Sequence, residues 1–501
     1  MISHDKLSDL SIWFVTGSQH LYGPEVLDQV YDDAQKIVAG LNASGNIPVR
    51  IVAKPVLTTA HAISQTFAEA AASADCAGII TWMHTFSPSQ MWLPALQTLA
   101  VPMLHLHTQY NAAIPWDTID MDFMNLNQSA HGGREFGFAA TRLDVHRKVV
   151  VGHWSEDAVQ ADIADWCRVA LARLDAQQGR IARFGDNMRQ VAVTEGNKVS
   201  ARIVFGYSVE GYGVGDLVAY MDQVADSDVQ RVVAEYHDLF DVAAELQSGG
   251  DRHESLRYAA RQEIALRAFL QDGGFTAFTT TFEDLHGLSQ LPGLAPQRLM
   301  AEGYGFSGEG DWKTAAFLRA SKIMAMGKPG GTSFMEDYTY NFAGRDSTVL
   351  GAHMLEICPS IAAGRPRIEI HPLGIGGKDD PVRAVFDGKP GRARNATIVD
   401  LGDRFRMIIN EVEAVAAPHD MPNLPVARVL WKPMPDLRVA AGAWIHAGGA
   451  HHTVYSDQVT LEQFRDFADL HDIEAIVIDE QASVRSVQDA LRWNAAYFRL
   501  R

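Results

Sequence analysis

The feature that most constrains the fold is an alternation of two hydrophobic patterns over residues 1–175. Short apolar runs such as IWFVTG and VPMLHLH are separated by longer stretches, such as DQVYDDAQKIVAGLNA, in which apolar residues recur at helical spacing. Strands that alternate with helices favour parallel βαβ units, because a parallel crossover is long enough to contain a helix. The pattern therefore predicts an α/β domain with an open, twisted parallel sheet over residues 1–175.

The carboxyl ends of these predicted strands are rich in polar, aromatic and histidine residues. They read TGSQHLYG, WMHTFSPSQMW and HLHTQYN. Ligands of open parallel sheets bind beyond the carboxyl ends of the strands. We therefore expect a binding surface along this edge of the sheet.

The rest of the chain divides into two segments that differ in their predicted helix and strand content. Residues 176–325 mix predicted strands, ARIVFGY and FTAFTTTF, with long helices such as DVQRVVAEYHDLFDVAAEL, which predicts a central α/β domain. Over residues 326–501 strands dominate, from FMEDYTYNF to VARVLWKP, and helices close the chain. This last segment predicts a mostly antiparallel, β-rich domain of the barrel or sandwich type.

Composition excludes several classes of protein. The chain has 501 residues, with 43 basic and 61 acidic side chains and a net charge of −18. It shows no cluster of Lys and Arg, which nucleic acid binding needs, so the composition argues against that class. Its three cysteines form no C-x-x-C pair, which argues against a disulfide framework or a thiolate zinc site. No stretch approaches the roughly 20 apolar residues of a membrane span, and the N-terminus has no long apolar signal region. We expect a cytoplasmic protein.

Residues 303–308, GYGFSG, have the G-x-G-x-x-G spacing of a dinucleotide-binding loop. That motif requires a preceding strand and an acidic residue about 20 positions later. Here the preceding PQRLMAEGY reads as helical, and the next acidic residue after Asp311 is Glu336. We interpret the glycines instead as a tight turn that places Glu309 at the start of the following helix. On this segment alone, Glu309 could equally be a solvated acid of a first helical turn.

Four further titratable residues stand in apolar or glycine-rich segments: Glu336, His353, His451 and His452. Burying a carboxylate is costly unless it is paired or binds a metal. Two carboxylates with two imidazoles would suit a labile divalent ion such as Mn²⁺. Their spacing matches no compact motif, however, and each histidine taken singly is more often a core residue than a ligand.

His353 could also pair with Glu356, three residues later in the chain. On a helix this spacing would place both side chains on one face, as in a di-iron site. The sequence HMLEI looks strand-like, which predicts instead that Glu356 faces away from His353.

Taken together, these segments resemble the L-arabinose isomerase family along the whole chain. The resemblance is carried by WFVTGSQHLYG, MDFMNLNQSAHGGREFGF, YGFSGEGDWKTAA, GGTSFMEDYTY, GAHMLEICPS, LGIGGKDDP and AGGAHHTVYS. It implies three domains, of which the N-terminal and central ones are Rossmann-like and the C-terminal one is β-rich. It also implies a hexamer with active sites at subunit contacts.

The resemblance implies a reaction and a metal site. The expected reaction is the metal-dependent conversion of L-arabinose to L-ribulose through an ene-diol, the first step of L-arabinose breakdown, with D-galactose as a possible side substrate. One Mn²⁺ ion per subunit would be held by Glu309, Glu336, His353 and His452, with no nucleotide cofactor. The two glutamates would also form the acid–base pair.

The resemblance further implies a set of residues that line the sugar. They are Gln19, Leu21, His131, Met188, Phe282 and Ile375. Among them, His131 is expected to reach the site of a neighbouring subunit.

Three other functions remain open from the sequence. A related ketol isomerase, such as an L-fucose isomerase-like enzyme, would differ in its preferred sugar. A non-catalytic sugar-binding protein could use the same type of α/β sheet. A metal-dependent hydrolase or lyase could use the same ligands.

Overall fold

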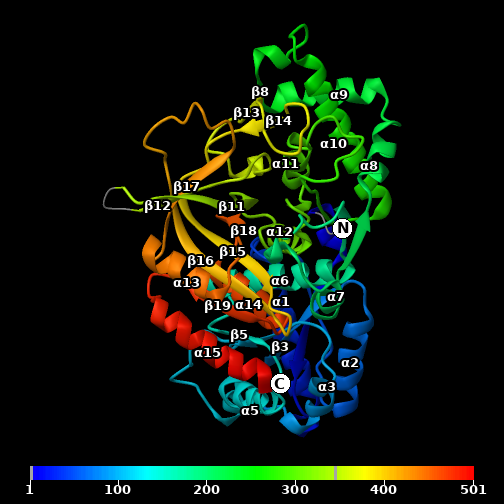
Figure 1. The fold of residues 1–501 in the computed structure, drawn as a ribbon. Helices are drawn as coiled ribbons and strands as arrows, with labels where there is room; N and C mark the ends of the chain where they lie inside the picture. Colours follow the sequence, from blue (N-terminus) through cyan, green and yellow to red (C-terminus); the bar gives the residue numbers. More distant parts are fainter. Residues whose placement is uncertain (1–3, 344–346, 501) are drawn as a thin grey trace. The chain divides into compact units, whose positions relative to one another are not determined.

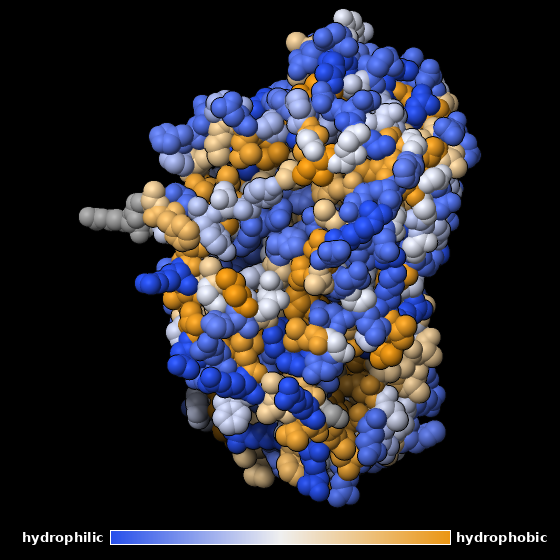
Figure 2. Space-filling model, viewed as in Figure 1, coloured by the Kyte–Doolittle hydropathy of each residue, from blue (hydrophilic) through white to orange (hydrophobic). Residues whose placement is uncertain are grey.

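The computed structural model of the chain describes residues 4–343 and 347–500. Contacts divide the chain after Leu174 into two compact units. The division into three domains, with boundaries near 175 and 325, stays a prediction. No helix of the described residues is both long and apolar enough to cross a membrane. Hydrophilic residues cover much of the face shown in Figure 2, with hydrophobic residues in patches between them.

The first unit contains the predicted parallel sheet, with the strand order β2-β1-β3-β4-β5. Its strands are β1 (Ser11–Gly17), β2 (Arg50–Ala53), β3 (Cys76–Met83), β4 (Met103–His107) and β5 (Lys148–Val151). In this order the crossover direction reverses between β1 and β3, so their carboxyl ends form the switch point at which such sheets bind ligands.

Helices cover both faces of this sheet. Ile79 on β3 belongs to a core cluster with residues of α2, α3 and α5, whereas a Cβ on the adjacent Gly78 would lie 3.0 Å from Trp166 of α6. Adjacent residues of a strand point to opposite faces, so β3 is buried on both sides and reads as a continuous apolar run. The helices are α1 (Pro24–Ala43), α2 (Ala60–Ala72), α3 (Leu93–Gln97), α4 (Met121–Leu126), α5 (Ser129–Arg142) and α6 (Asp157–Gln178), which continues past Leu174.

The second unit begins with another parallel sheet, in the order β10-β9-β6-β7. Its strands are β6 (Arg180–Phe184), β7 (Ser208–Tyr212), β9 (Ala277–Thr279) and β10 (Gly305–Ser307). Helices connect these strands: α7 (Lys198–Phe205), α8 (Val214–Met221), α9 (Asp226–Leu239), α10 (His253–Gly273) and α11 (Leu294–Ala301). This parallel sheet confirms the Rossmann-like fold expected for the central region.

One strand prediction in this region is wrong. Most of ARIVFGY lies in helix α7 rather than in a strand. The Asn197 side chain accepts hydrogen bonds from the backbone of Val199 and Ser200, and Gly206 ends the helix in a left-handed conformation with φ of 96°. Capping at both ends therefore outweighs the β preference of the apolar residues between them.

The C-terminal part forms a closed antiparallel barrel of six strands, in the order β15-β18-β11-β12-β17-β16, with β16 pairing back to β15. They are β11 (Thr332–Asn341), β12 (Thr348–Ala352), β15 (Gly391–Asp400), β16 (Phe405–Val415), β17 (Arg428–Pro433) and β18 (His452–Ser456). Figure 1 shows these strands in yellow-green to orange. The barrel confirms the predicted β-rich domain and removes the exposed edges of an open sheet.

Further elements surround the barrel. Strand β19 (Glu474–Ile478) pairs with β16 in parallel, and a small sheet has the order β14-β13-β8. Its strands are β8 (Asp241–Val242), β13 (Arg367–Ile370) and β14 (Val382–Val385). The helices are α12 (Trp312–Met324), α13 (Leu437–Ala447), α14 (Leu461–Leu470) and α15 (Val484–Leu500). Short 3₁₀ helices occur at His4–Asp9, His20–Tyr22, Ser89–Met91, Ala192–Thr194, Ala244–Leu246 and Pro359–Ile361.

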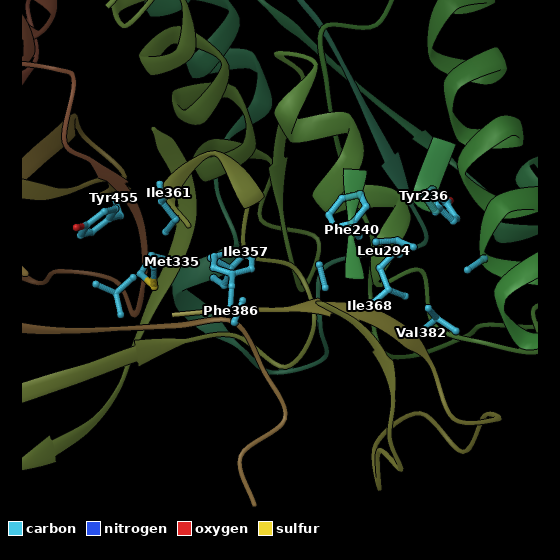
Figure 3. Packing of buried hydrophobic residues seen from close by; sticks show 14 of the residues in the cluster. Tyr236, Phe240, Leu294, Met335, Ile357, Ile361, Ile368, Val382, Phe386 and Tyr455 are labelled. Carbon is cyan, nitrogen blue, oxygen red and sulfur yellow. The ribbon is translucent and has the colours of Figure 1, made fainter. Parts of the chain in front are cut away.

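One hydrophobic cluster joins the barrel to helices of the central region. Figure 3 shows it extending from Tyr455 and Met335, on barrel strands, through Ile357 and Phe386 to Tyr236 on α9. The barrel and these helices therefore share one core, which explains why the second unit is not divided further.

We predict that Gly351→Ala destabilises the barrel. A Cβ at Gly351 on β12 would overlap the ring of Trp431 and lie 3.0 Å from the sulfur of Met335. Overpacking of this kind costs about 1–3 kcal/mol, so the thermal unfolding midpoint should fall. Gly364→Ala is the control, because a Cβ there has no neighbour within 4 Å among the described residues. Equal midpoints for the two variants would contradict the prediction.

Candidate metal centre

Glu309 lies in the turn between β10 and α12, and its backbone is left-handed, with φ of 58°. The neighbouring glycines permit close packing here. A Cβ on Gly308 would lie 2.9 Å from the ring of His353, and one on Gly310 would lie 2.6 Å from Cα of Asn187. Helix α11 precedes the glycines, as predicted, and β10 lies within their spacing rather than before it. The segment is thus a tight turn around a carboxylate and lacks the geometry of a dinucleotide-binding loop.

Three of the predicted ligands come together around this turn. The ligand atoms of Glu309, His353 and His452 all lie within 4.8 Å of one another. His353 directly follows β12, and His452 is the first residue of β18. Both imidazoles are buried, while Glu309 is partly exposed. One carboxylate and two imidazoles in this arrangement could hold a divalent metal ion.

A buried carboxylate orients each of these imidazoles. Nδ1 of His452 donates to Oδ2 of Asp311 at 3.1 Å, and Nδ1 of His353 donates to Oε2 of Glu356 at 2.6 Å. The Nε2 atoms are therefore left as the possible ligands. A carboxylate that accepts from the other ring nitrogen is the usual support for a metal-bound histidine. Nε2 of His452 is buried and has no hydrogen-bond partner among the described residues, although Oε2 of Glu309 lies 3.9 Å away. An unpaired buried nitrogen is costly, and an ion would satisfy it.

The prediction that Glu356 faces away from His353 is wrong. Strand β12 ends at Ala352, and the chain then turns so that Glu356 reaches back to His353. The helix-like spacing of three residues in the sequence was the available signal, but a turn rather than a helix realises it.

Asp311, which is not among the predicted site residues, lies next to the ligands. Asp311 caps helix α12 by accepting from the backbone and hydroxyl of Thr314, at 3.3 and 2.8 Å. It also pairs with Lys313 at 3.1 Å, and the ammonium group of Lys313 donates further to the carbonyl oxygens of Thr194 and Glu195. An aspartate just before a predicted helix is a recognisable cap, but its contact with His452 depends on tertiary structure.

Burial and neighbouring charges act in opposite directions on the pKa values of the three ligands. Burial acts to raise the pKa of Glu309, but the hydrogen bond with His451 and the charge of His452 outweigh it and lower that pKa. Burial lowers the pKa of His452 despite the support of Asp311. For His353 burial acts to lower the pKa, but Glu356 outweighs it and the pKa is raised.

Glu336, the fourth predicted ligand, lies on β11 and does not belong to the group of ligand atoms within 4.8 Å of one another. It pairs in register with His452 on β18 and with Ala352 on β12, the residue before His353. Directly opposed residues of antiparallel strands project to the same face, so Glu336 and His452 share a face of the barrel wall. The charge of Glu336 acts to raise the pKa of His353. The register with β12 shifts farther along the strand, between Asp337 and Thr339.

Three predicted sugar-lining residues lie in the same unit as these ligands. The backbone N–H of Met188 donates to the carbonyl oxygen of Glu309 at 3.0 Å. Phe282 is buried, and its ring stacks on His353 with 5.9 Å between centroids. Ile375 is exposed on a loop, and a Cβ on the next residue, Gly376, would lie 3.4 Å from the carbonyl oxygen of Phe282.

The other three predicted sugar-lining residues, Gln19, Leu21 and His131, lie in the first unit. Gln19 and Leu21 follow strand β1, and the Leu21 side chain is exposed. His131 on α5 stacks on Phe86, with 4.6 Å between ring centroids, and donates from Nδ1 to Oε1 of Gln128 at 3.2 Å. It lines an open pocket of about 720 Å³.

The chain is similar to known proteins over almost its full length. The family models for the L-arabinose isomerase N-terminal, central and C-terminal domains match residues 6–178, 180–327 and 331–474. An L-arabinose isomerase of Herpetosiphon aurantiacus is 58% identical over 494 residues, which cover 99% of each chain. One of Geobacillus stearothermophilus is 59% identical with the same coverage, and one of a Nocardioides species is 58% identical over 98% of each chain.

We predict that Glu356→Gln weakens metal binding. Glutamine keeps the size and the acceptor oxygen of Glu356 but removes the charge that supports His353, and changes of this kind typically cost about 10- to 100-fold in metal affinity. Calorimetric titration of metal-stripped protein with Mn²⁺ measures the effect. Glu480→Gln, at an exposed position, is the control and should bind like the unaltered protein. Equal affinities for the two variants would show that Glu356 does not support the ligand.

Proposed function

The chain belongs to the L-arabinose isomerase family, and from this premise we propose that it interconverts L-arabinose and L-ribulose. The observation that carries the proposal is the convergence of Glu309, His353 and His452, which come from three separate segments of the chain. Each of these segments is among those that resemble the family. D-galactose would be a side substrate, and the reaction would be the first step of L-arabinose breakdown in the cytoplasm.

The proposed cofactor is one Mn²⁺ ion per subunit, with Glu336 as the fourth ligand beside Glu309, His353 and His452. The register of β11 against β18 supports the inclusion of Glu336. Mixed carboxylate and imidazole ligands suit a labile divalent ion such as Mn²⁺. When bound, the ion would polarise the oxygens at C1 and C2 of the sugar.

The two glutamates would move the protons. One carboxylate would accept the proton from C2 while O1 gains a proton, which gives the ene-diol. The other would deliver a proton to C1 while the hydroxyl at C2 loses one, which gives the ketose. Histidines hold Glu309 in its ionised form, as the direction of its pKa indicates. Met188 and Phe282 flank Glu309 and His353, where they would orient the sugar and exclude water.

We further propose a hexamer in which neighbouring subunits complete each site. In this arrangement Gln19, Leu21 and His131 contact the sugar held by the metal site of another subunit. The pocket that His131 lines also contains Met121 and Met124, both of them exposed. Apolar side chains grouped at the surface of a folded unit are typical of a protein contact.

The first test is ketose formation from L-arabinose by metal-stripped protein, before and after addition of Mn²⁺. We expect turnover only with the ion, because the proposed reaction depends on it. A folded, metal-loaded protein that is inactive on L-arabinose but active on another aldose would contradict the proposed substrate and favour a related ketol isomerase.

The same assay tests the place of Glu336. Glu336→Gln should abolish turnover and lower the affinity for Mn²⁺ while leaving the fold intact, because it removes both a ligand and a proton carrier. Wild-type rates in this variant would remove Glu336 from the proposed site.

A complementation experiment tests the sharing of sites between subunits. His131→Ala and Glu309→Gln should each be nearly inactive, but a hexamer mixed from the two contains some sites with an intact His131 and an intact Glu309. Mixed oligomers should therefore regain part of the activity. If oligomers shown by mass spectrometry to be mixed remain inactive, the sites are not shared.

A further inference from the structure

The first residues of the loop that follows β6 form hydrogen bonds with the turn that contains Glu309. The buried side chain of Asn187 donates from Nδ2 to the carbonyl oxygens of Thr194 and Gly310, at 2.6 and 3.0 Å. The next residue, Met188, donates its backbone N–H to the carbonyl of Glu309. Asn187 thus fixes one side of Met188.

Arg189, on the other side of Met188, contacts a second loop, which follows β9. Its backbone N–H donates to Oε2 of Glu283 at 3.0 Å, and its guanidinium lies 3.5 Å from the same oxygen. The guanidinium also pairs with Asp284. Glu283 and Asp284 directly follow Phe282, whose ring stacks on His353. The Arg189 bridge therefore links the segment that carries Met188 to the segment that carries Phe282.

Both ends of this bridge show local backbone strain. Gln190, next to Arg189, has φ of 65°, and Asp284 has φ of 55°. Residues other than glycine rarely adopt this left-handed conformation, and it persists where surrounding contacts hold it, often at functional sites. The two loops leave β6 and β9 at their carboxyl ends, and these strands are neighbours in the sheet.

We propose that Arg189 is a positioning residue for sugar binding. By joining the two loops, it holds Met188 and Phe282 in place beside Glu309 and His353. The proposal rests on the proposed function, because it takes the sugar as the ligand that these two side chains contact.

The size of the effect follows from the exposure of the bridge. The side chains of Arg189 and Asp284 are 63% and 53% exposed, and exposed ion pairs contribute little to stability. Loss of the bridge should therefore raise the KM for L-arabinose about two- to fivefold and leave kcat and Mn²⁺ affinity nearly unchanged. Salt screens exposed charges, so the KM of the unaltered protein should rise towards that of the variant at about 1 M salt.

The experiment compares Arg189→Ala with Arg231→Ala in the Mn²⁺-loaded protein. Arg231 is a matched control, because it is 62% exposed and also pairs with two carboxylates, Asp228 and Glu235, along α9. We expect a raised KM for Arg189→Ala, an unchanged KM for Arg231→Ala and a partial effect for Arg189→Lys. Asp284→Asn removes the partner charge with a residue that tolerates the left-handed backbone. Combined with Arg189→Ala, it should raise KM no further than the stronger single variant.

A second measurement does not depend on turnover. Hydrogen exchange in the peptide that covers residues 185–191 should be faster in Arg189→Ala than in Arg231→Ala. An unchanged KM together with unchanged exchange would overturn the proposal, and additive effects of the Arg189 and Asp284 changes would also do so. Inactivity of the unaltered protein on L-arabinose would overturn the proposed function instead, while the exchange data would still decide whether the bridge holds the loop.

Discussion

The arrangement of the candidate metal centre depends on one buried carboxylate, that of Asp311. It is 1% exposed, and a charge so placed is stable only when its oxygens are fully paired. Asp311 achieves this by capping α12, pairing with Lys313 and accepting from His452. A single group thereby connects the helix that follows Glu309 to the barrel strand that begins with His452. Removal of its charge would leave Lys313 buried without its anionic partner and His452 without its orientation.

Strand register in the barrel places Glu336, the proposed fourth ligand, relative to the histidines. Because β11 pairs with both β18 and β12, Glu336 lies opposite His452 and beside the residue that precedes His353. A shift of one residue in the register of β11 would turn Glu336 to the other face of the barrel wall. The register that closes the barrel therefore also determines which face Glu336 and His452 share. The hydrophobic cluster shared with α9 and the small sheet holds the barrel against the helices (Figure 3).

The chemistry proposed for this centre uses features of different rigidity. The histidines are buried and fixed by carboxylates, whereas Met188 and Phe282 are carried by loops at the carboxyl ends of neighbouring strands. Parallel sheets commonly place variable, ligand-contacting loops at this edge.

The sequence by itself determined the fold classes, the family and the residues of the triad. Hydrophobic period is a local property, so it predicted the parallel sheet of the first unit and the strand-rich C-terminal region. It failed for ARIVFGY, where the caps at Asn197 and Gly206 decided the conformation. Only the tertiary structure showed that Glu309, His353 and His452 converge, that Asp311 and Glu356 orient the histidines, and that Arg189 bridges two loops. Apart from His353 and Glu356, these contacts join residues far apart in the chain, because strand pairing and core packing bring them together.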